Sequence, residues 1–194
     1  MRYKFTDTEI KKIENSIVIL CDTREKESTH ILSYFEKHNI PYQIQKLDYG
    51  DYSFKVPLGV FKGQQREIYF DREYVIERKA SIDELVGNFA DQGARIKKEL
   101  AHMNKYGIRC DLLVENPNFE LDILRENYRS QYKGESLYNR IYKTIQGEYG
   151  VPIFPQQKGM MGFKIEKLCK GYVYAKFKHE GWIEEEIEDE GLSK

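Results

Sequence analysis

The sequence has few cysteines, and none of them is spaced for a scaffold or a metal site. Its 194 residues contain three, Cys21, Cys110 and Cys169, far apart and without a Cys-x-x-Cys pair. An odd number of widely spaced cysteines argues against both a disulfide framework and a zinc ribbon. The four histidines also lack the spacing of a metal site. Cys21 and Cys110 lie in or beside apolar runs, so we interpret them as small buried residues.

Other absences narrow the class of protein further. No apolar run approaches the length of a membrane span, and the first 16 residues are too polar for a secretory signal. We therefore expect an intracellular protein with no membrane partner. The sequence contains no Gly-x-x-x-x-Gly-Lys-Ser/Thr or Gly-x-Gly-x-x-Gly motif and no nucleophile elbow. We expect no nucleotide cofactor.

The chain also has almost no net charge, since the formal value is −1 at pH 7. The distribution is uneven, because residues 184–194 hold six acids and one lysine. Without them, the 31 basic and 32 acidic residues become 30 and 26. A mildly basic body permits DNA binding without requiring it. We predict a single domain over residues 1–183, followed by an acidic, solvated C-terminal tail over residues 184–194.

The hydrophobic pattern predicts alternating strands and helices. Continuous or alternating apolar runs predict strands at 16–22, 42–47, 50–56, 111–115 and 151–154, and a hairpin within 67–79. Helical spacing predicts helices at 28–39, from 81 to about 103 with a break near its glycines, at 136–149 and at 164–179. This order predicts an α/β fold with a mixed sheet.

The predicted strand at the end of the hairpin, YVIERK, ends in three consecutive charged residues. Residues two apart share a face of a strand, so Glu77 and Lys79 point the same way and Arg78 points the opposite way. A carboxylate offers a hard oxygen ligand to Mg²⁺, and a lysine beside it can stabilise charge on a phosphate or orient water. This pairing suits metal-dependent cleavage of a phosphodiester.

Two further acids end β-type runs. Asp22 closes the first buried strand in CDTREKES, and Asp51 follows Gly50 in DYGDYSF, with Asp48 nearby as a spare. If these strands are neighbours, Asp22, Asp51 and Glu77 converge on one ion. Arg24 shares the face of Asp22, and Glu25 either binds the metal or pairs with Arg78.

Each of these features also has an ordinary structural interpretation. A Glu-x-Lys pair on a strand is usually a solvated ion pair, an Asp after a strand is often a cap, and Gly-Asp is most often a turn. The three together, each at the polar end of a β-type run, favour a functional site.

The blocks CDTREKES, LDYGDYSF and YVIERKASIDELVGN resemble, in order, the D-x-R-E, G-D and E-R-K blocks of XPF-type structure-specific nucleases. The resemblance covers about residues 16–116 clearly and the remainder loosely. It implies a restriction-endonuclease-like fold, a mixed central β-sheet flanked by helices. It also implies a Mg²⁺ or Mn²⁺ site formed by Asp22, Asp51 and Glu77, with Lys79 as the catalytic lysine.

The resemblance gives supporting roles in the site to Arg24, Glu25 and Arg78, and places Arg95 near it. Glu99 departs from the pattern, which often has Gln there. The tandem helix-hairpin-helix module of many cellular relatives has no counterpart here, so the chain resembles a stand-alone nuclease domain of bacterial or phage type, located in the cytoplasm. DNA is the implied partner, with a second copy of the chain, or a nuclease or helicase, as open alternatives.

Basic and aromatic residues interleave in two later stretches, 127–143 and 170–182. Lysine and arginine there would contact phosphates, and tyrosines would stack on exposed bases. Tyr138, Ile141, Tyr142 and Ile145 have helical spacing, which is more typical of a core. Besides Arg95, the candidates for contact with the DNA backbone are Arg125, Arg129, Lys133, Arg140 and Lys143.

The sequence therefore predicts a metal-dependent endodeoxyribonuclease, acting on branched or single/double-strand junction DNA in repair, recombination or phage DNA metabolism. Two alternatives stay open. One is a catalytically silent member of the same fold, which binds DNA or a nuclease partner without cutting. The other keeps the chemistry but is a restriction-type or junction-resolving enzyme.

Overall fold

The computed structural model describes residues 2–90 and 93–183, and within them seven strands form one mixed sheet. The strands lie in the order β3 (Tyr42–Gln45), β2 (Val18–Asp22), β4 (Tyr52–Val56), β6 (Tyr74–Lys79), β7 (Arg109–Val114) and β8 (Ile153–Pro155), and β5 (Ile68–Tyr69) pairs with β4 off this path. Strand β4 is antiparallel to both β2 and β6, while β3 runs parallel to β2, and β7 and β8 run parallel to β6. This is the mixed α/β sheet that the sequence predicts.

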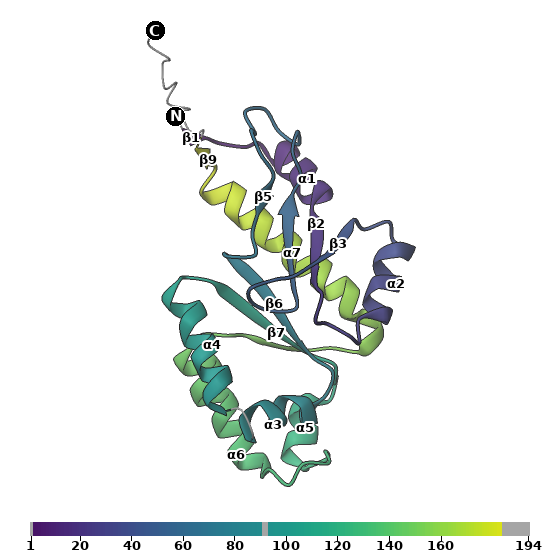
Figure 1. The fold of residues 1–194 in the computed structure, drawn as a ribbon, viewed down its shortest axis with the longest axis vertical. Helices are drawn as coiled ribbons and strands as arrows, with labels where there is room; N and C mark the ends of the chain where they lie inside the picture. Colours follow the sequence, from purple (N-terminus) through teal and green to yellow (C-terminus); the bar gives the residue numbers. More distant parts are fainter. Residues whose placement is uncertain (1, 91–92, 184–194) are drawn as a thin grey trace.

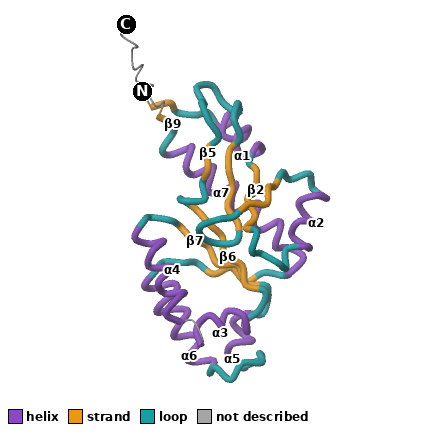
Figure 2. The backbone as a smooth tube through the Cα atoms, in the orientation of Figure 1, coloured by secondary structure: helices purple, strands orange, loops and turns teal. Residues whose placement is uncertain are grey.

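Helices cover both faces of the sheet (Figure 1). One group is α1 (Asp7–Ser16), α2 (Thr29–Lys37) and α7 (Met161–His179). The other is α3 (Ile82–Ala90), α4 (Gly93–Lys105), α5 (Phe119–Leu124), α6 (Gly134–Asn139) and the π-helix η1 (Arg140–Glu148). A 3-10 turn, η2 (Lys158–Met160), leads into α7, and a ribbon of β1 (Arg2–Tyr3) and β9 (Trp182–Ile183) joins the ends of the described chain (Figure 2).

The sheet separates two hydrophobic cores, because successive residues of a strand point to opposite faces. On β6, Tyr74 and Ile76 belong to the core beneath α1, α2 and α7, while Val75 belongs to the core beneath α3–α6. On β7, Leu113 faces the first core, and Leu112 faces the second. The same alternation sets the direction of the charged residues at the end of β6.

The junction between the two halves of the sheet is short. Strands β4 and β6 share one ladder pair, Tyr52 with Ile76. The Ser53 hydroxyl adds a hydrogen bond by donating to the Tyr74 carbonyl at 2.8 Å. By contrast, β6 and β7 pair along six residues.

Some elements differ from the sequence prediction. The hairpin expected within 67–79 is wrong, because β5 pairs with β4 rather than with β6. The reason is packing: Phe70, next to β5, is 1 % exposed and stacks on Phe54 of β4 with 4.6 Å between ring centroids. Helix α1 lies outside the predicted elements, and its signal is a capping box between Thr6 and Glu9.

Other expectations are confirmed. Helices α3 and α4 both fall in the stretch predicted as helix from 81 to about 103; residues 91–92 between them lie outside the described part of the chain, so the break itself stays a prediction. The predicted helix 136–149 is present, but it begins at Gly134 as α6 and continues as η1. Residues 184–194 lie outside the described part of the chain, so the boundary between a body and an acidic tail stays a prediction. Among the described helices, none has the length and apolar character needed to cross a bilayer.

Candidate active site

Three strand ends meet at one edge of the sheet. The backbone N–H of Asp22, the last residue of β2, donates to the carbonyl of Asp51 at 2.8 Å. The N–H of Asp51, which precedes β4, donates to the carbonyl of Ile76 in β6 at 2.9 Å. The prediction that these strands are neighbours is confirmed, and it places the two aspartates beside the charged end of β6.

Gly50 allows this close approach. Its φ of +66° lies in the left-handed region, which a side chain disfavours. A Cβ at this position would lie 2.9 Å from the Val75 Cβ and 3.1 Å from the Ile76 carbonyl oxygen. The glycine therefore fixes how near Asp51 comes to β6.

Glu77 and Lys79 lie on one face of β6, as the alternation predicts. The Lys79 Nζ donates to Glu77 Oε1 at 2.6 Å and lies 3.6 Å from Glu84 Oε1 of α3. Burial by itself lowers the pKa of Lys79, but the neighbouring carboxylates of Glu77, Asp51 and Glu84 together outweigh burial and raise the pKa above its usual value. The lysine is thus a held, charged ammonium beside Asp51.

The charged form of the Asp51 carboxylate is disfavoured by its surroundings. Burial raises its pKa well above the ordinary value, and the nearby carboxylates of Glu77 and Glu25 raise it further. The backbone N–H of Arg78, which donates to Asp51 Oδ2 at 2.8 Å, and the charge of Lys79 oppose this rise only in part. A cation at this position would offset the repulsion.

Arg78 points to the opposite face of β6. Its guanidinium donates to Glu25 twice, at 3.1 Å and 2.9 Å, so of the two roles expected for Glu25 the structure has the pair with Arg78. Its Nη1 also lies 3.0 Å from Glu115 Oε1, an ion pair that lacks the geometry of a hydrogen bond. His30 Nε2 contacts the same oxygen of Glu115 at 2.6 Å. The side chains of Arg78, Glu25 and Glu115 are 4, 8 and 3 % exposed, so this is a buried ionic network.

Asp22 is fully engaged with donors. The Arg24 side chain donates from Nε to Asp22 Oδ1 at 2.8 Å and from Nη2 to Oδ2 at 2.9 Å. The backbone N–H of Arg24 also donates to Asp22 Oδ1, at 2.7 Å. The N–H of Leu47 donates to Oδ2 at 2.7 Å. Burial raises the pKa of Asp22, but these hydrogen bonds from Arg24 and Leu47 outweigh it and hold the pKa below the usual value.

The three candidate carboxylates differ in how well they suit a divalent cation. Asp51 and Glu77 are hard oxygen donors whose mutual repulsion a Mg²⁺ ion would relieve. Asp22 would need to exchange the Arg24 fork for the ion. Over residues 2–90 and 93–183, no three His, Cys, Asp or Glu side chains are grouped closely enough to hold a metal. The three-carboxylate site therefore stays a prediction.

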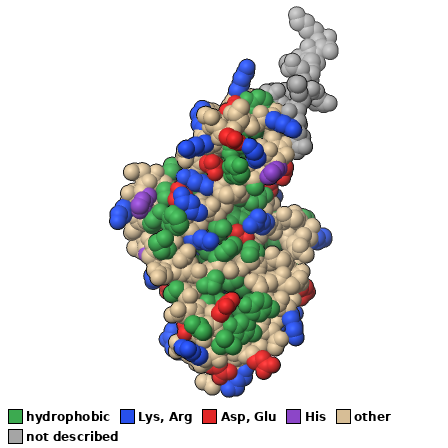
Figure 3. Space-filling view, turned by 180° about the vertical axis from the view of Figure 1, so that it is seen from behind, with side chains coloured by type: hydrophobic (Ala, Val, Ile, Leu, Met, Phe, Trp, Pro, Cys, Tyr) green, Lys and Arg blue, Asp and Glu red, His purple; other side chains and the backbone are tan. Residues whose placement is uncertain are grey.

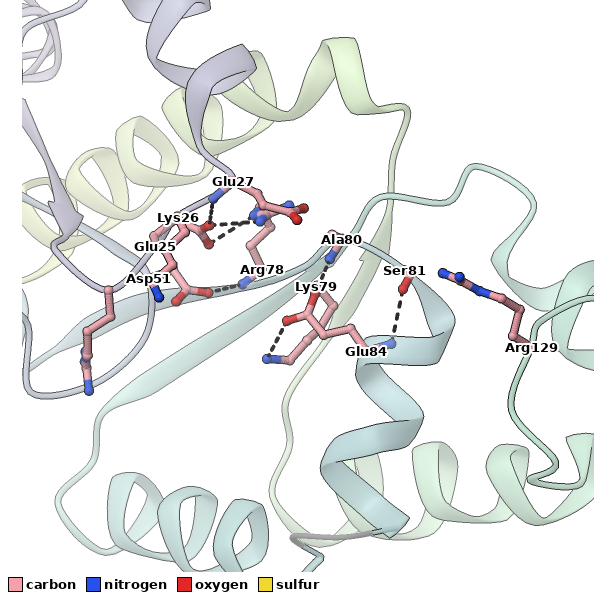
Figure 4. A pocket seen from close by; sticks show the side chains of 11 residues that line it. Glu25, Lys26, Glu27, Asp51, Arg78, Lys79, Ala80, Ser81, Glu84 and Arg129 are labelled. Carbon is pink, nitrogen blue, oxygen red and sulfur yellow. Dashed lines mark hydrogen bonds and ion pairs between the residues drawn. The ribbon is translucent and has the colours of Figure 1, made fainter.

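A cavity of about 620 Å³ opens over this edge of the sheet (Figure 4). Its lining combines acids with an excess of bases, a composition that suits a phosphodiester held beside carboxylates. The charged lining residues are Arg24, Glu25, Lys26, Glu27, Asp51, Arg78, Lys79, Glu84 and Arg129.

The predicted DNA contacts are spread more widely. Arg129 lines the cavity with a side chain that is 93 % exposed, and its backbone N–H donates to Asp83 Oδ1 of α3 at 2.8 Å. Arg125, Lys133, Arg140 and Lys143 do not line it. Arg95 falls in α4, but its side chain lies outside the described residues. On the face shown in Figure 3, Lys and Arg side chains are interspersed with Asp and Glu rather than joined in one stripe over the described residues.

Three residues that organise the site are missing from the predicted set. Glu115 follows β7, and its N–H donates to the Lys79 carbonyl at 2.8 Å, so an acid after a buried strand was its available signal. Asp83 holds the loop of Arg129, and its position in the first turn of α3 gave no functional signal. His30 contacts Glu115, which is 85 positions away in the sequence, so no local sequence pattern could have predicted this contact.

Comparison with known proteins agrees with this geometry. The model of the ERCC4 domain family matches residues 21–158, which include every strand end described above. A search of curated proteins returned no match. ERCC4 domains are nuclease domains of the XPF type, as the sequence resemblance indicated, and they have a restriction-endonuclease-like fold. Because the match spans more than half of the 194 residues, this chain belongs to the ERCC4 domain family.

Proposed function

We propose that this protein is a Mg²⁺- or Mn²⁺-dependent endodeoxyribonuclease whose active centre is formed by Asp22, Asp51, Glu77 and Lys79. The observation that carries the proposal is the position of Lys79 and Asp51. Both line one charged cavity, and Lys79 is held by Glu77 at 2.6 Å. Membership in a family of structure-specific nucleases supports the same reaction.

Asp51 and Glu77 would hold the metal. Asp22 would become a third ligand once its hydrogen bonds with the Arg24 side chain are broken. When bound, the ion supplies Lewis-acid stabilisation of charge on the phosphate. The Arg24 side chain is 60 % exposed, so its guanidinium could reach a DNA phosphate by exchanging its bonds to Asp22 and to the Leu47 carbonyl for the phosphate oxygens. Arrival of DNA would thus release Asp22.

Lys79 acts as a charged group beside the scissile phosphate. Its raised pKa keeps it protonated at neutral pH, which suits electrostatic stabilisation of the transition state and orientation of water rather than removal of a proton. Glu84 and Glu77 hold the ammonium from two sides. Arg129, on the rim of the cavity, would contact the DNA backbone.

The alternative function is a silent member of the family that binds DNA without cutting. The complete set of three acids and a lysine favours catalysis. A plasmid-nicking assay in Mg²⁺, Mn²⁺ or EDTA tests the choice. Wild type should nick only with metal, and Asp51→Asn and Lys79→Ala should lose activity by about 10²-fold or more. Lys12→Ala, an exposed lysine on α1, serves as the matched control.

Equal activity in wild type, Asp51→Asn and Lys79→Ala would favour the binding function. Comparison of flap, fork, four-way-junction and linear substrates then tests the structure-specific proposal. Preference for linear duplex would favour a restriction-type enzyme, and preference for four-way junctions would favour a junction-resolving one.

A further inference from the structure

A second hollow, of about 340 Å³, is formed in part by the loop that leads to Asp51. It is lined by Asp48, Tyr49, Arg72, His102, Tyr106 and Ile108. None of these residues lines the cavity of Asp51 and Lys79. The catalytic proposal gives these residues no role.

Three aromatic rings form a connected group in this hollow. The Tyr49 and His102 rings have centroids 5.6 Å apart and are tilted by 33°, and the Tyr49 hydroxyl is hydrogen-bonded to His102 Nδ1. The His102 and Tyr106 centroids are 4.6 Å apart. Tyr106 is 60 % exposed, and His102 is also exposed. Aromatic surface is therefore presented to solvent in a concave setting.

Cationic side chains stand around the rings. The Arg72 side chain is 78 % exposed and pairs with Asp48 at 2.9 Å. Such an exposed pair is worth little in free energy, so Arg72 can exchange Asp48 for a phosphate at small cost. The Lys105 Nζ lies 5.5 Å from the centroid of Tyr106. Rings for a base and cations for its phosphates thus occur together.

The hollow adjoins the active centre through the chain itself. Tyr49 is two residues before Asp51, so the Cα atoms of the two residues are at most about 7 Å apart. A nucleotide on Tyr49 and a phosphate at Asp51 can therefore belong to one strand. In a duplex the faces of the bases are covered by their neighbours, so only an unpaired base can stack on these rings.

We propose that the hollow formed by Tyr49, His102, Tyr106 and Arg72 binds one unpaired nucleotide of the DNA substrate by stacking its base and contacting its phosphate. This inference rests on the proposed nuclease function and adds a source of substrate preference. DNA with a single-stranded segment next to the cleavage point would gain a contact that blunt duplex lacks.

Binding measured in EDTA tests the proposal without any dependence on cleavage. Fluorescence anisotropy of the full chain with a labelled 12-nucleotide oligothymidine should show about tenfold weaker binding for Tyr106→Ala, the loss expected for one stacked base. Tyr106→Phe should bind within about twofold of wild type, because it keeps the ring. Tyr174→Ala, a tyrosine 43 % exposed on α7, is the matched control and should bind as wild type does. Binding of a blunt duplex of the same length should not change.

Arg72→Ala tests the phosphate contact. It should lower the slope of log affinity against log salt for oligothymidine by about 0.7, the value for one phosphate of a single strand. Equal binding of oligothymidine by Tyr106→Ala and Tyr174→Ala, or equal losses on single strand and duplex, would overturn the proposal. Nicking by Asp51→Asn at the wild-type rate would instead contradict the nuclease function, and the anisotropy result would still report on the hollow.

Discussion

Asp51 accepts a hydrogen bond at 2.8 Å from the backbone of Arg78, the residue whose side chain leaves on the opposite face of the sheet. The side chains of β6 thus alternate between two sets of charged residues, and members of both sets line one cavity. On one side, Asp51 and Glu77 repel each other beside Lys79, and on the other, Arg78 is enclosed by Glu25 and Glu115. In the first set one ammonium leaves repulsion at Asp51 uncompensated, whereas in the second a guanidinium pairs with two carboxylates.

The repulsion at Asp51 predicts a stability effect that depends on pH. The folded-state pKa of Asp51 is raised above its unfolded value of about 3.9, so its contribution to stability is greatest below that pH and is lost as pH rises through the folded pKa. Asp51→Asn should therefore melt higher than wild type at pH 7–8 in EDTA, by about 2–4 °C for each kcal/mol of repulsion removed. The gain should vanish near pH 4. Thermal melts across this range check it, and a gain that is largest at pH 4 would contradict it.

Metal binding should reverse the order of these two proteins. If Asp51 and Glu77 hold Mg²⁺, a concentration of 100 times Kd stabilises wild type by about 2.7 kcal/mol. Asp51→Asn should show little response, and Glu36→Gln, an exposed acid on α2, should respond as wild type does. Melting curves with Mg²⁺, Mn²⁺ and EDTA provide the measurement. A response shared equally by all three proteins would place the ion elsewhere.

Arg78 should be a stability residue first. Its removal in Arg78→Met leaves Glu25 without its buried partner, and such a loss costs about 3–5 kcal/mol. The control, Arg72→Met, removes an arginine whose side chain is 78 % exposed and should change stability by less than about 1 kcal/mol. Urea unfolding compares them. The double variant Arg78→Met with Glu25→Leu should recover part of the loss, and no recovery would mean that packing rather than charge is responsible.

Gly50→Ala should damage both stability and activity. Positive φ alone costs an alanine about 1–2 kcal/mol, and the 2.9 Å contact with Val75 adds a steric cost of about 1–3 kcal/mol. Gly59→Ala isolates the first effect, because Gly59 has φ +85° and a Cβ added there would meet no other atom within 4 Å. Urea unfolding of the two variants, with nicking assays beside it, provides the measurement. Equal destabilisation of the two variants would show that the close approach to β6 is not tight.

The meeting of the candidate site residues could be predicted because these residues lie at strand ends. Asp22, Asp51 and Glu77 each follow or precede a short apolar run, and the two-residue period of a strand fixes the opposite directions of Glu77 and Arg78. These are local properties of the chain. The mixed sheet follows from the same runs and the helical stretches between them.

Long-range pairings could not be predicted in this way. His30 meets Glu115 only after the chain has crossed the sheet, and Tyr49 meets His102 across 53 positions. Strand β5 pairs with β4 because Phe70 stacks on Phe54, a preference for a partner that hydrophobic periodicity does not encode. The grip of Arg24 on Asp22 depends on a rotamer, which sequence leaves undetermined.

The single ladder pair between Tyr52 and Ile76 has a mechanical consequence. One hydrophobic core, which α7 also lines, contains Phe54 of β4 and Ile76 of β6, so the two strands are held by packing as well. Besides that ladder pair, three hydrogen bonds cross the junction, and Asp51 takes part in two of them: its N–H donates to the Ile76 carbonyl, and its carboxylate accepts from the Arg78 N–H. The residue proposed as a metal ligand is therefore also a main tether between β4 and β6, so its replacement by a residue without a side-chain oxygen would loosen the sheet as well as remove a carboxylate.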